Sequence, residues 1–244
     1  MPDIKRVVKN SYAKIASQPV KSCGCSCKNK QSIAVQIGYT AEQLQSVGEA
    51  NMGLGCGNPT AFSRIRLGNT VVDLGCGGGI DCFLASKKTG PAGRVIGVDF
   101  TEEMIVKAKA NALKGRYNNV EFKLGDIENL PLEENSVDVI ISNCVINLAP
   151  HKDKVFAEAY RVLKSGGRIC VSDIVLLGEL SPEQRSDEVL IAGCVGGAVL
   201  KHEYIDIVKK AGFKVTILSE NKDISKQQYR SISLESLLIE GLKP

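Results

Sequence analysis

The chain has 244 residues, of which 43% are hydrophobic and 24% are charged, both close to the averages of soluble globular proteins. This composition excludes the collagen-like, disordered and coiled-coil classes, and a net charge of +4 is too small to argue for a nucleic-acid partner. The sequence begins without the apolar run of a signal peptide and has no uninterrupted stretch of membrane length. We therefore expect a cytoplasmic protein without nucleic-acid or membrane partners, whose oligomeric state the sequence leaves open.

Cysteine is unusually frequent, with nine residues, whereas histidine occurs only at His151 and His202. Structural disulfides are rare in a reducing compartment, so metal-binding or catalytic roles are favoured for at least some of these thiols. The shortage of histidine argues against a His-rich zinc or iron site. We expect sulfur to carry any soft-metal chemistry.

The N-terminal part of the chain differs in pattern from the rest. We expect an N-terminal cap segment over 1–69 and the main domain over 70–244. The cap segment is predicted to contain helices over 4–17 and 41–51. Thr40 and Gln43 fit a capping box at the start of the second helix, since each can bond to the other's backbone N–H.

Beyond residue 70, apolar runs alternate with helical stretches. The predicted strands are 71–74, 94–99, 120–124, 137–142 and 168–176, and the predicted helices between them are 80–88, 102–113 with Thr101 as N-cap, and 153–164. The C-terminal part is predicted to form helices over 182–191 and 202–211 and strands over 213–218 and 231–239. Strands that alternate with helices indicate βαβ units and an α/β fold with a parallel sheet, which the last two strands close as an antiparallel pair.

The most specific motif is Asp73-Leu-Gly75-Cys-Gly77-Gly-Gly79, between the first strand and its helix. Glycines here permit a tight turn and let a ligand approach the backbone. The NAD fingerprint G-x-G-x-x-G requires glycine where this chain has Ile80, which weighs against a dehydrogenase. The acid-x-G-x-G-x-G form fits fully and resembles motif I of class I S-adenosylmethionine methyltransferases. This resemblance implies their Rossmann-like fold, with a mostly parallel sheet and helices on both faces.

The same resemblance implies which residues bind S-adenosylmethionine. The glycine loop would hold the methionine part, Asp99 the ribose hydroxyls and Asp126 the adenine amino group; a carboxylate suits the ribose because it offers several acceptor lone pairs in one plane. The full set of expected contacts is Asp73, Gly75, Cys76, Gly77, Asp99, Phe100, Met104, Asp126, Ile127 and Asn143. Two alternatives stay open: Met104 packs either on adenine or in the core, and Asp126 also suits a plain turn.

Three cysteines lie beside this expected cofactor site. Cys144 follows the fourth strand, Cys56 lies in a glycine-rich loop before the first strand, and Cys194 follows the fifth strand. Soft thiolates select thiophilic centres. The peptide Ser-Asn-Cys-Val-Ile-Asn-Leu at 142–148 resembles arsenite S-adenosylmethionine methyltransferases, and the resemblance extends from about residue 39 to about residue 213. It implies that the three cysteines bind trivalent arsenic and support its methylation.

The remaining cysteines have other interpretations. Cys76, Cys82 and Cys170 are expected to be small buried side chains. The cluster formed by Cys23, Cys25 and Cys27 is interpreted as a flexible tail, as a capture site for zinc or a metalloid, or as accessory thiols in disulfide exchange. A tetrahedral zinc site there would need a fourth ligand.

The resulting hypothesis is an arsenite methyltransferase that acts in arsenic detoxification. Arsenite or its thiol conjugates would exchange onto the three cysteines, and the arsenic lone pair would take the methyl group without a general base. Thioredoxin or glutathione would supply the reducing thiol. Two alternatives are a methyltransferase for an organic molecule such as a quinone or sterol, and a non-catalytic metalloid-binding protein. The sequence leaves the number of methyl groups open.

Overall fold

The structure is a computed structural model that describes residues 3–17, 32–224 and 232–244. The cluster of Cys23, Cys25 and Cys27 lies outside these residues, so all three interpretations of it stay open. In the described part, no helix is both long and apolar enough to cross a membrane.

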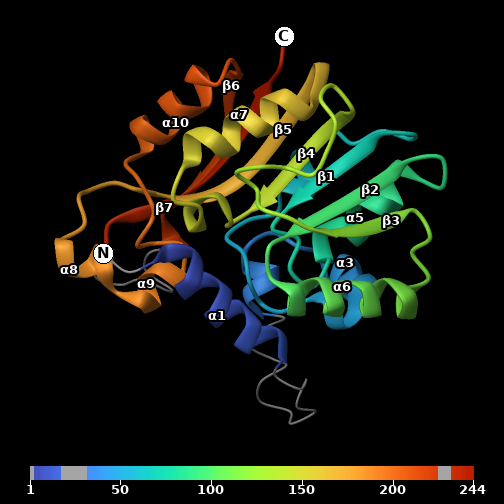
Figure 1. The fold of residues 1–244 in the computed structure, drawn as a ribbon, viewed down its shortest axis with the longest axis horizontal. Coiled ribbons are helices and arrows are strands. Elements are labelled where there is room, and N and C mark those ends of the chain that lie inside the picture. The colour runs from blue at the N-terminus through green and yellow to red at the C-terminus, as the bar shows by residue number, and fades with distance from the viewer. Residues whose placement is uncertain (1–2, 18–31, 225–231) are drawn as a thin grey trace.

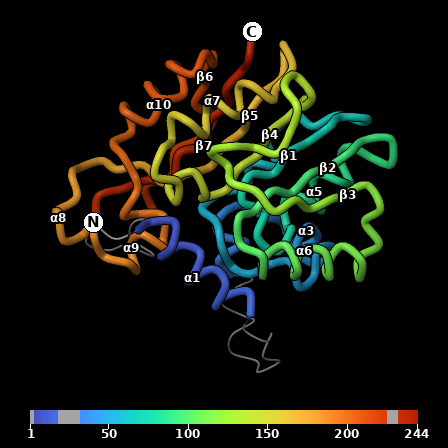
Figure 2. The backbone as a smooth tube through the Cα atoms, in the orientation of Figure 1, coloured from blue at the N-terminus to red at the C-terminus, as the bar shows by residue number. Residues whose placement is uncertain are grey.

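A seven-stranded sheet in the order β3-β2-β1-β4-β5-β7-β6 forms the centre of the described chain (Figures 1 and 2). The strands are β1 (Thr70–Leu74), β2 (Arg94–Asp99), β3 (Val120–Leu124), β4 (Val137–Asn143), β5 (Leu163–Leu176), β6 (Lys214–Asn221) and β7 (Leu234–Leu242). The first five strands pair in parallel, whereas β7 runs antiparallel to both β5 and β6. The predicted α/β fold with an antiparallel C-terminal pair is confirmed.

Helices cover both faces of this sheet (Figure 1). The α-helices with described bounds are α1 (Ile4–Ser17), α3 (Ala41–Val47), α4 (Pro59–Phe62), α5 (Ile80–Thr89), α6 (Glu102–Gly115), α7 (Lys152–Val162), α8 (Pro182–Ser186), α9 (Glu188–Ala192) and α10 (Lys201–Lys210), with 3-10 turns η1 (Gly48–Ala50) and η2 (Ile146–Leu148). On one face, Phe156 of α7 and Tyr204 of α10 pack edge to face within the apolar cluster of the sheet. On the other, Phe83 of α5 and Ile105 of α6 belong to a second cluster.

Local sequence signals explain several boundaries and correct others. The capping box of Thr40 and Gln43 is confirmed at the start of α3. The single helix predicted over 182–191 is wrong, because Asp187 lies between α8 and α9 and its side chain accepts bonds from two N–H groups of α9. Thr101 is the N-cap of α6, but its side chain makes no cap hydrogen bond.

The connectivity of the sheet creates one crevice at its carboxyl edge. The chain passes from β1 to β2 and β3 on one side, then returns to β4 on the other side of β1. At such a switch point the connections leave in opposite directions, which opens a binding crevice beyond the strand ends. The glycine loop follows β1 and Cys144 follows β4, so both border this crevice. Helix α1 lies across it, packed against α6 and α9 (Figure 1).

Candidate functional site

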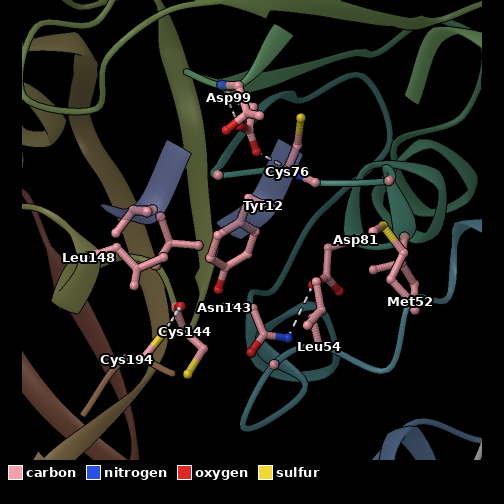
Figure 3. A pocket seen from close by; sticks show the side chains of 18 of the residues that line it. Tyr12, Met52, Leu54, Cys76, Asp81, Asp99, Asn143, Cys144, Leu148 and Cys194 are labelled. Carbon is pink, nitrogen blue, oxygen red and sulfur yellow. Dashed lines mark hydrogen bonds between the residues drawn. The ribbon is translucent and has the colours of Figure 1, made fainter. Parts of the chain in front are cut away.

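A cavity of about 570 Å³ occupies the crevice (Figure 3). The predicted site residues that line it are Asp73, Gly75, Cys76, Gly77, Asp99, Phe100, Asp126, Ile127, Asn143, Cys144 and Cys194. Two predicted site residues within the described part of the chain are not among its lining residues. Cys56 is buried directly behind Cys144, whereas Met104 is fully buried in α6, which favours core packing of the two interpretations left open for it.

The glycine loop is held by backbone bonds to the end of β2. Gly75 N–H and Cys76 N–H both donate to the carbonyl oxygen of Val98, at 2.8 and 3.0 Å. Gly75 has φ +66°, and a Cβ there would lie 2.4 Å from the side chain of Val145. Gly77 has φ +50° and open space where a Cβ would be. A ligand in the cavity can therefore approach this backbone closely, which residues with side chains would prevent.

Two buried carboxyl groups flank the loop. Asp99 is 7% exposed and accepts hydrogen bonds from Gly77 N–H at 3.0 Å and Thr101 N–H at 2.9 Å. Burial raises the pKa of Asp99. Asp73 accepts the thiol hydrogen bond of Cys82 at 3.2 Å, and burial with the nearby Asp81 raises its pKa well above the ordinary range. Because these groups are desolvated, a ligand that donates hydrogen bonds or carries positive charge would stabilise their ionised forms.

Asp126 already has a partner from the N-terminal helix. One carboxylate oxygen accepts Lys5 Nζ at 2.6 Å, and the other accepts Glu128 N–H at 2.9 Å. Three residues of α1, Lys5, Val8 and Tyr12, line the cavity. Their i, i+3, i+7 spacing puts them on one helix face. The spacing of these three residues is visible in the sequence, but the helix predicted over 4–17 was given no role at the site.

Tyr12 brings an aromatic ring into the middle of the cavity. Figure 3 shows it between Asp99 and Cys144, and its hydroxyl donates to the carbonyl oxygen of Ala192 at 3.3 Å. Burial raises the pKa of Tyr12 well above its ordinary value, and the thiols of Cys194 and Cys144 raise it further. The ring therefore bridges the acidic half of the cavity and the half with the thiols.

Asn143 connects the two halves through its amide. Its Oδ1 accepts Cys56 N–H at 3.1 Å, and its Nδ2 donates to the Gly57 carbonyl at 2.7 Å and to the Tyr39 hydroxyl at 2.9 Å. Asn143 is one of the cofactor contacts that the sequence predicts. It does line the cavity, but its hydrogen bonds to Cys56 and Gly57 fix the loop that carries Cys56.

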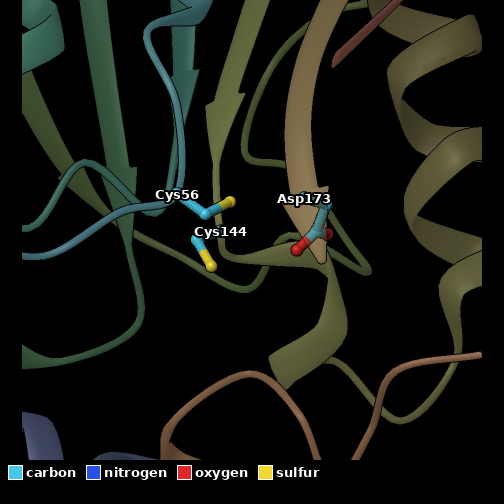
Figure 4. A group of neighbouring side chains, drawn as sticks. All are labelled: Cys56, Cys144 and Asp173. Carbon is cyan, nitrogen blue, oxygen red and sulfur yellow. The ribbon is translucent and has the colours of Figure 1, made fainter. Parts of the chain in front are cut away.

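The three candidate thiols gather at one side of the cavity, although they come from distant parts of the chain. Cys194 Sγ donates to the carbonyl oxygen of Cys144 at 2.7 Å. The Sγ atoms of Cys56 and Cys144 and a carboxylate oxygen of Asp173 all lie within 4.8 Å of one another (Figure 4). Hydrogen bonds with the Cys194 and Cys56 thiols, together with burial, raise the pKa of Cys144 well above its ordinary value. Cys144 is therefore a protonated thiol at neutral pH.

Unusual backbone conformations position two of these thiols. Cys144 has φ +59° and Cys194 has φ +66°, the left-handed region that residues with a Cβ seldom adopt. The N–H of Cys144 donates to the Ser172 carbonyl at 2.8 Å, which holds the turn after β4 in place. Strained conformations of this kind persist where the surrounding structure fixes them, and they concentrate at functional sites.

Asp173 lies at the site but is absent from the residues that sequence reasoning singled out. It lies fully buried in β5, where its oxygens accept Asn147 Nδ2 at 2.9 Å and the Tyr204 hydroxyl at 3.1 Å. Burial raises its pKa to about 7, and the nearby Lys152 acts in the opposite direction. An acid within an apolar strand was the available signal, because buried acids are rare without a specific role.

The other described cysteines lie away from this group. Cys76, Cys82 and Cys170 are 4%, 0% and 0% exposed, so the expectation that they are buried is confirmed. Burial raises the pKa of Cys76 to about 11 and that of Cys170 to about 12. Cys170 donates its thiol hydrogen to the Pro59 carbonyl at 3.4 Å, which makes it a suitable control cysteine.

Comparisons with known proteins agree with this geometry. A family model described as a methyltransferase domain matches residues 65–212. An arsenite methyltransferase of Halobacterium salinarum is 43% identical over 87% of this chain, and one of Aquipseudomonas alcaligenes is 36% identical over 89% of it. The matches span 58% and 64% of the lengths of these two relatives. The crystal structure of an arsenic(III) S-adenosylmethionine methyltransferase from Chlamydomonas reinhardtii has a TM-score of 0.68 and 31% identity, covering 88% of this chain and 73% of that one.

Proposed function

The chain belongs to the family of arsenite S-adenosylmethionine methyltransferases, and from this premise we propose that it transfers methyl groups from S-adenosylmethionine to trivalent arsenic bound by Cys56, Cys144 and Cys194. One observation carries the proposal: cysteines from three distant segments lie together beside a cavity whose other side is a glycine loop with a buried acid, with the Sγ atoms of Cys56 and Cys144 within 4.8 Å of each other and the Cys194 thiol bonded to the Cys144 carbonyl oxygen. The proposed role is detoxification of arsenic in the cytoplasm.

The residues of the cavity fit S-adenosylmethionine. The open space at Gly77 admits a ligand against the backbone, and the carboxyl group of Asp99 retains lone pairs for hydroxyl donors after its two backbone bonds. Asp73 and Asp81 offer buried acceptors where a ligand's ammonium group would be stabilised. When bound, S-adenosylmethionine supplies an electrophilic methyl group. The roles of Phe100, Asp126, Ile127 and Asn143 as further contacts belong to this proposal.

The thiols suit arsenite because the hydroxyl groups of arsenite can accept the protons that the thiols release. When arsenite exchanges onto a thiol, one As–O bond is replaced by an As–S bond, and the departing hydroxyl leaves as water with the thiol proton. A buried, protonated thiol such as that of Cys144 therefore needs no neighbouring base. Three As–S bonds leave the arsenic lone pair free. The burial of the three cysteines, each at 9% exposure or less, excludes water from this nucleophile.

A reducing thiol completes the proposal. Methyl transfer leaves arsenic formally pentavalent, and two electrons from a pair of thiols return it to the trivalent state while a disulfide forms. An external thiol, from thioredoxin or glutathione, reopens that disulfide by exchange. The thiols of Cys23, Cys25 and Cys27 are candidates for an intermediate step in this exchange.

The test is a product assay. We expect arsenite, S-adenosylmethionine and a thiol reductant to give methylated arsenic, detected by mass spectrometry, together with S-adenosylhomocysteine. Each product should be absent when arsenite is replaced by a quinol. If the protein binds arsenite but releases no S-adenosylhomocysteine, it is a binding protein, and if it methylates only the quinol, the arsenic assignment is wrong.

A further inference from the structure

We propose that Cys56, Cys144 and Asp173 form a second kind of site, one that binds a divalent thiophilic cation such as Zn²⁺ and thereby excludes arsenite. The site shares two thiols with the proposed function but uses a carboxylate where arsenic uses Cys194. Two thiolates and a carboxylate are among the ligand types that Zn²⁺ prefers.

The spacing of the three groups fits such a cation. In a tetrahedral zinc site with ordinary bond lengths, two sulfur ligands or a sulfur and an oxygen lie roughly 3.6–3.8 Å apart. The two Sγ atoms and the carboxylate oxygen already lie within 4.8 Å of one another, so side-chain rotations that move these atoms by about 1 Å bring them into range (Figure 4). Cys194 is not part of this group of three, since its thiol is directed to the Cys144 carbonyl.

The carboxylate is oriented as a ligand needs to be. Asn147 Nδ2, Ile174 N–H and the Tyr204 hydroxyl all donate to Asp173, which fixes the carboxyl plane. Such outer partners typically account for roughly tenfold to a hundredfold in metal affinity.

The charges around the site also balance. A divalent cation with two thiolates and one carboxylate carries a net charge of −1. Lys152 is 7% exposed and lies within electrostatic reach of Asp173, so its ammonium group offsets part of this charge, although burial lowers the pKa of Lys152. Binding releases the proton of each thiol to solvent, so the apparent affinity for Zn²⁺ rises with pH. The cation reaches the site through the cavity, where Cys144 lines the wall.

Zn²⁺ and arsenite therefore use different sets of residues, and two single variants distinguish the two sets. In the 244-residue protein with Cys23, Cys25 and Cys27 changed to serine (the background protein), we expect one Zn²⁺ per chain, measured by displacement of Co²⁺ from its visible tetrahedral spectrum. Asp173→Asn should weaken Zn²⁺ binding at least tenfold and change arsenite binding less than threefold. Cys194→Ser should weaken arsenite binding at least tenfold and leave Zn²⁺ binding within threefold.

Two further variants complete the design. Cys144→Ser should lose both ligands, and Cys170→Ser, at a buried cysteine outside the site, should lose neither. Added Zn²⁺ should raise the melting temperature of the background protein but not that of its Asp173→Asn form. The inference is overturned if the background protein binds no Zn²⁺, or if Asp173→Asn binds it normally, or if that variant loses arsenite to the same extent. If the protein binds Zn²⁺ as expected but does not bind arsenite, the proposed function is wrong, whereas the Zn²⁺ site is supported.

Discussion

The two halves of the cavity are built in different ways. The half with the glycine loop comes from one short stretch, in which backbone N–H groups and Asp99 are fixed by bonds between β1 and β2. The half with the thiols comes from three segments, and loop contacts such as those of Asn143 hold it together. A site made of local backbone is insensitive to most side chains, whereas a site assembled from distant loops depends on a few. Substitutions should therefore have sharply different effects in the two halves.

The largest effect is expected in the half with the thiols. Cys144→Ser removes the residue that contacts both other cysteines, and oxygen binds trivalent arsenic far more weakly than sulfur does. We expect arsenite methylation to fall at least a hundredfold and arsenite binding to be lost, while S-adenosylmethionine binding stays within threefold. Isothermal titration with each ligand measures this. Cys170→Ser is the matched control, and normal methylation by Cys144→Ser would contradict the thiol site.

The next largest effect is expected at Asp99. Asp99→Ala removes the acceptor expected to bind the ribose hydroxyls, and hydrogen bonds to a charged group contribute about 1.5–3 kcal/mol each. We expect the dissociation constant of S-adenosylmethionine to rise roughly tenfold to a hundredfold, with arsenite binding unchanged. Equal loss of both ligands would show that the two halves are not independent. The melting temperature of the variant separates that result from unfolding.

A smaller effect concerns stability and pH. Asp173 has a pKa of about 7 in the folded protein against an ordinary value of 3.8. Because the pKa is higher in the folded state, the protonated carboxyl group of Asp173 stabilises the folded protein. This contribution to the free energy of unfolding is complete below pH 3.8 and is lost as the pH rises through about 7. The free energy of unfolding should therefore fall more steeply between pH 4 and 7 in the wild type than in Asp173→Asn. Urea unfolding across this range measures it, with the exposed Asp153→Asn as control, and parallel curves for wild type and Asp173→Asn would refute it.

The smallest effect is expected at the N-terminal helix. Lys5→Ala removes ion pairs to Asp126 and Glu128 that are partly exposed, and such pairs contribute about 1 kcal/mol or less. We expect S-adenosylmethionine to dissociate two to five times faster, because the helix is then held less firmly over the cavity. Stopped-flow dissociation measures this. Lys9→Ala, whose ion pair with Glu102 is exposed, is the control and should not change the rate.

The sequence predicted the half with the glycine loop better than the rest. The alternation of strands and helices gave the sheet, and the spacing of Gly75, Gly77 and Asp99 gave the loop and its acid, because these features depend on neighbours along the chain. The predicted strand ends already placed Cys56, Cys144 and Cys194 beside the cofactor site, but their role as arsenic ligands came only from the family resemblance, because their exact contacts depend on how the sheet brings separate loops together. Asp173 was missed because its importance arises from burial beside the thiols.

Helix α1 places Lys5 over the acidic half of the cavity and Tyr12 over the half with the thiols, on one rigid rod. Both halves of the cavity therefore lie under the same helix. We expect α1 to be displaced before either S-adenosylmethionine or arsenite enters the cavity. The exchange of the two reactants should accordingly show a common kinetic step.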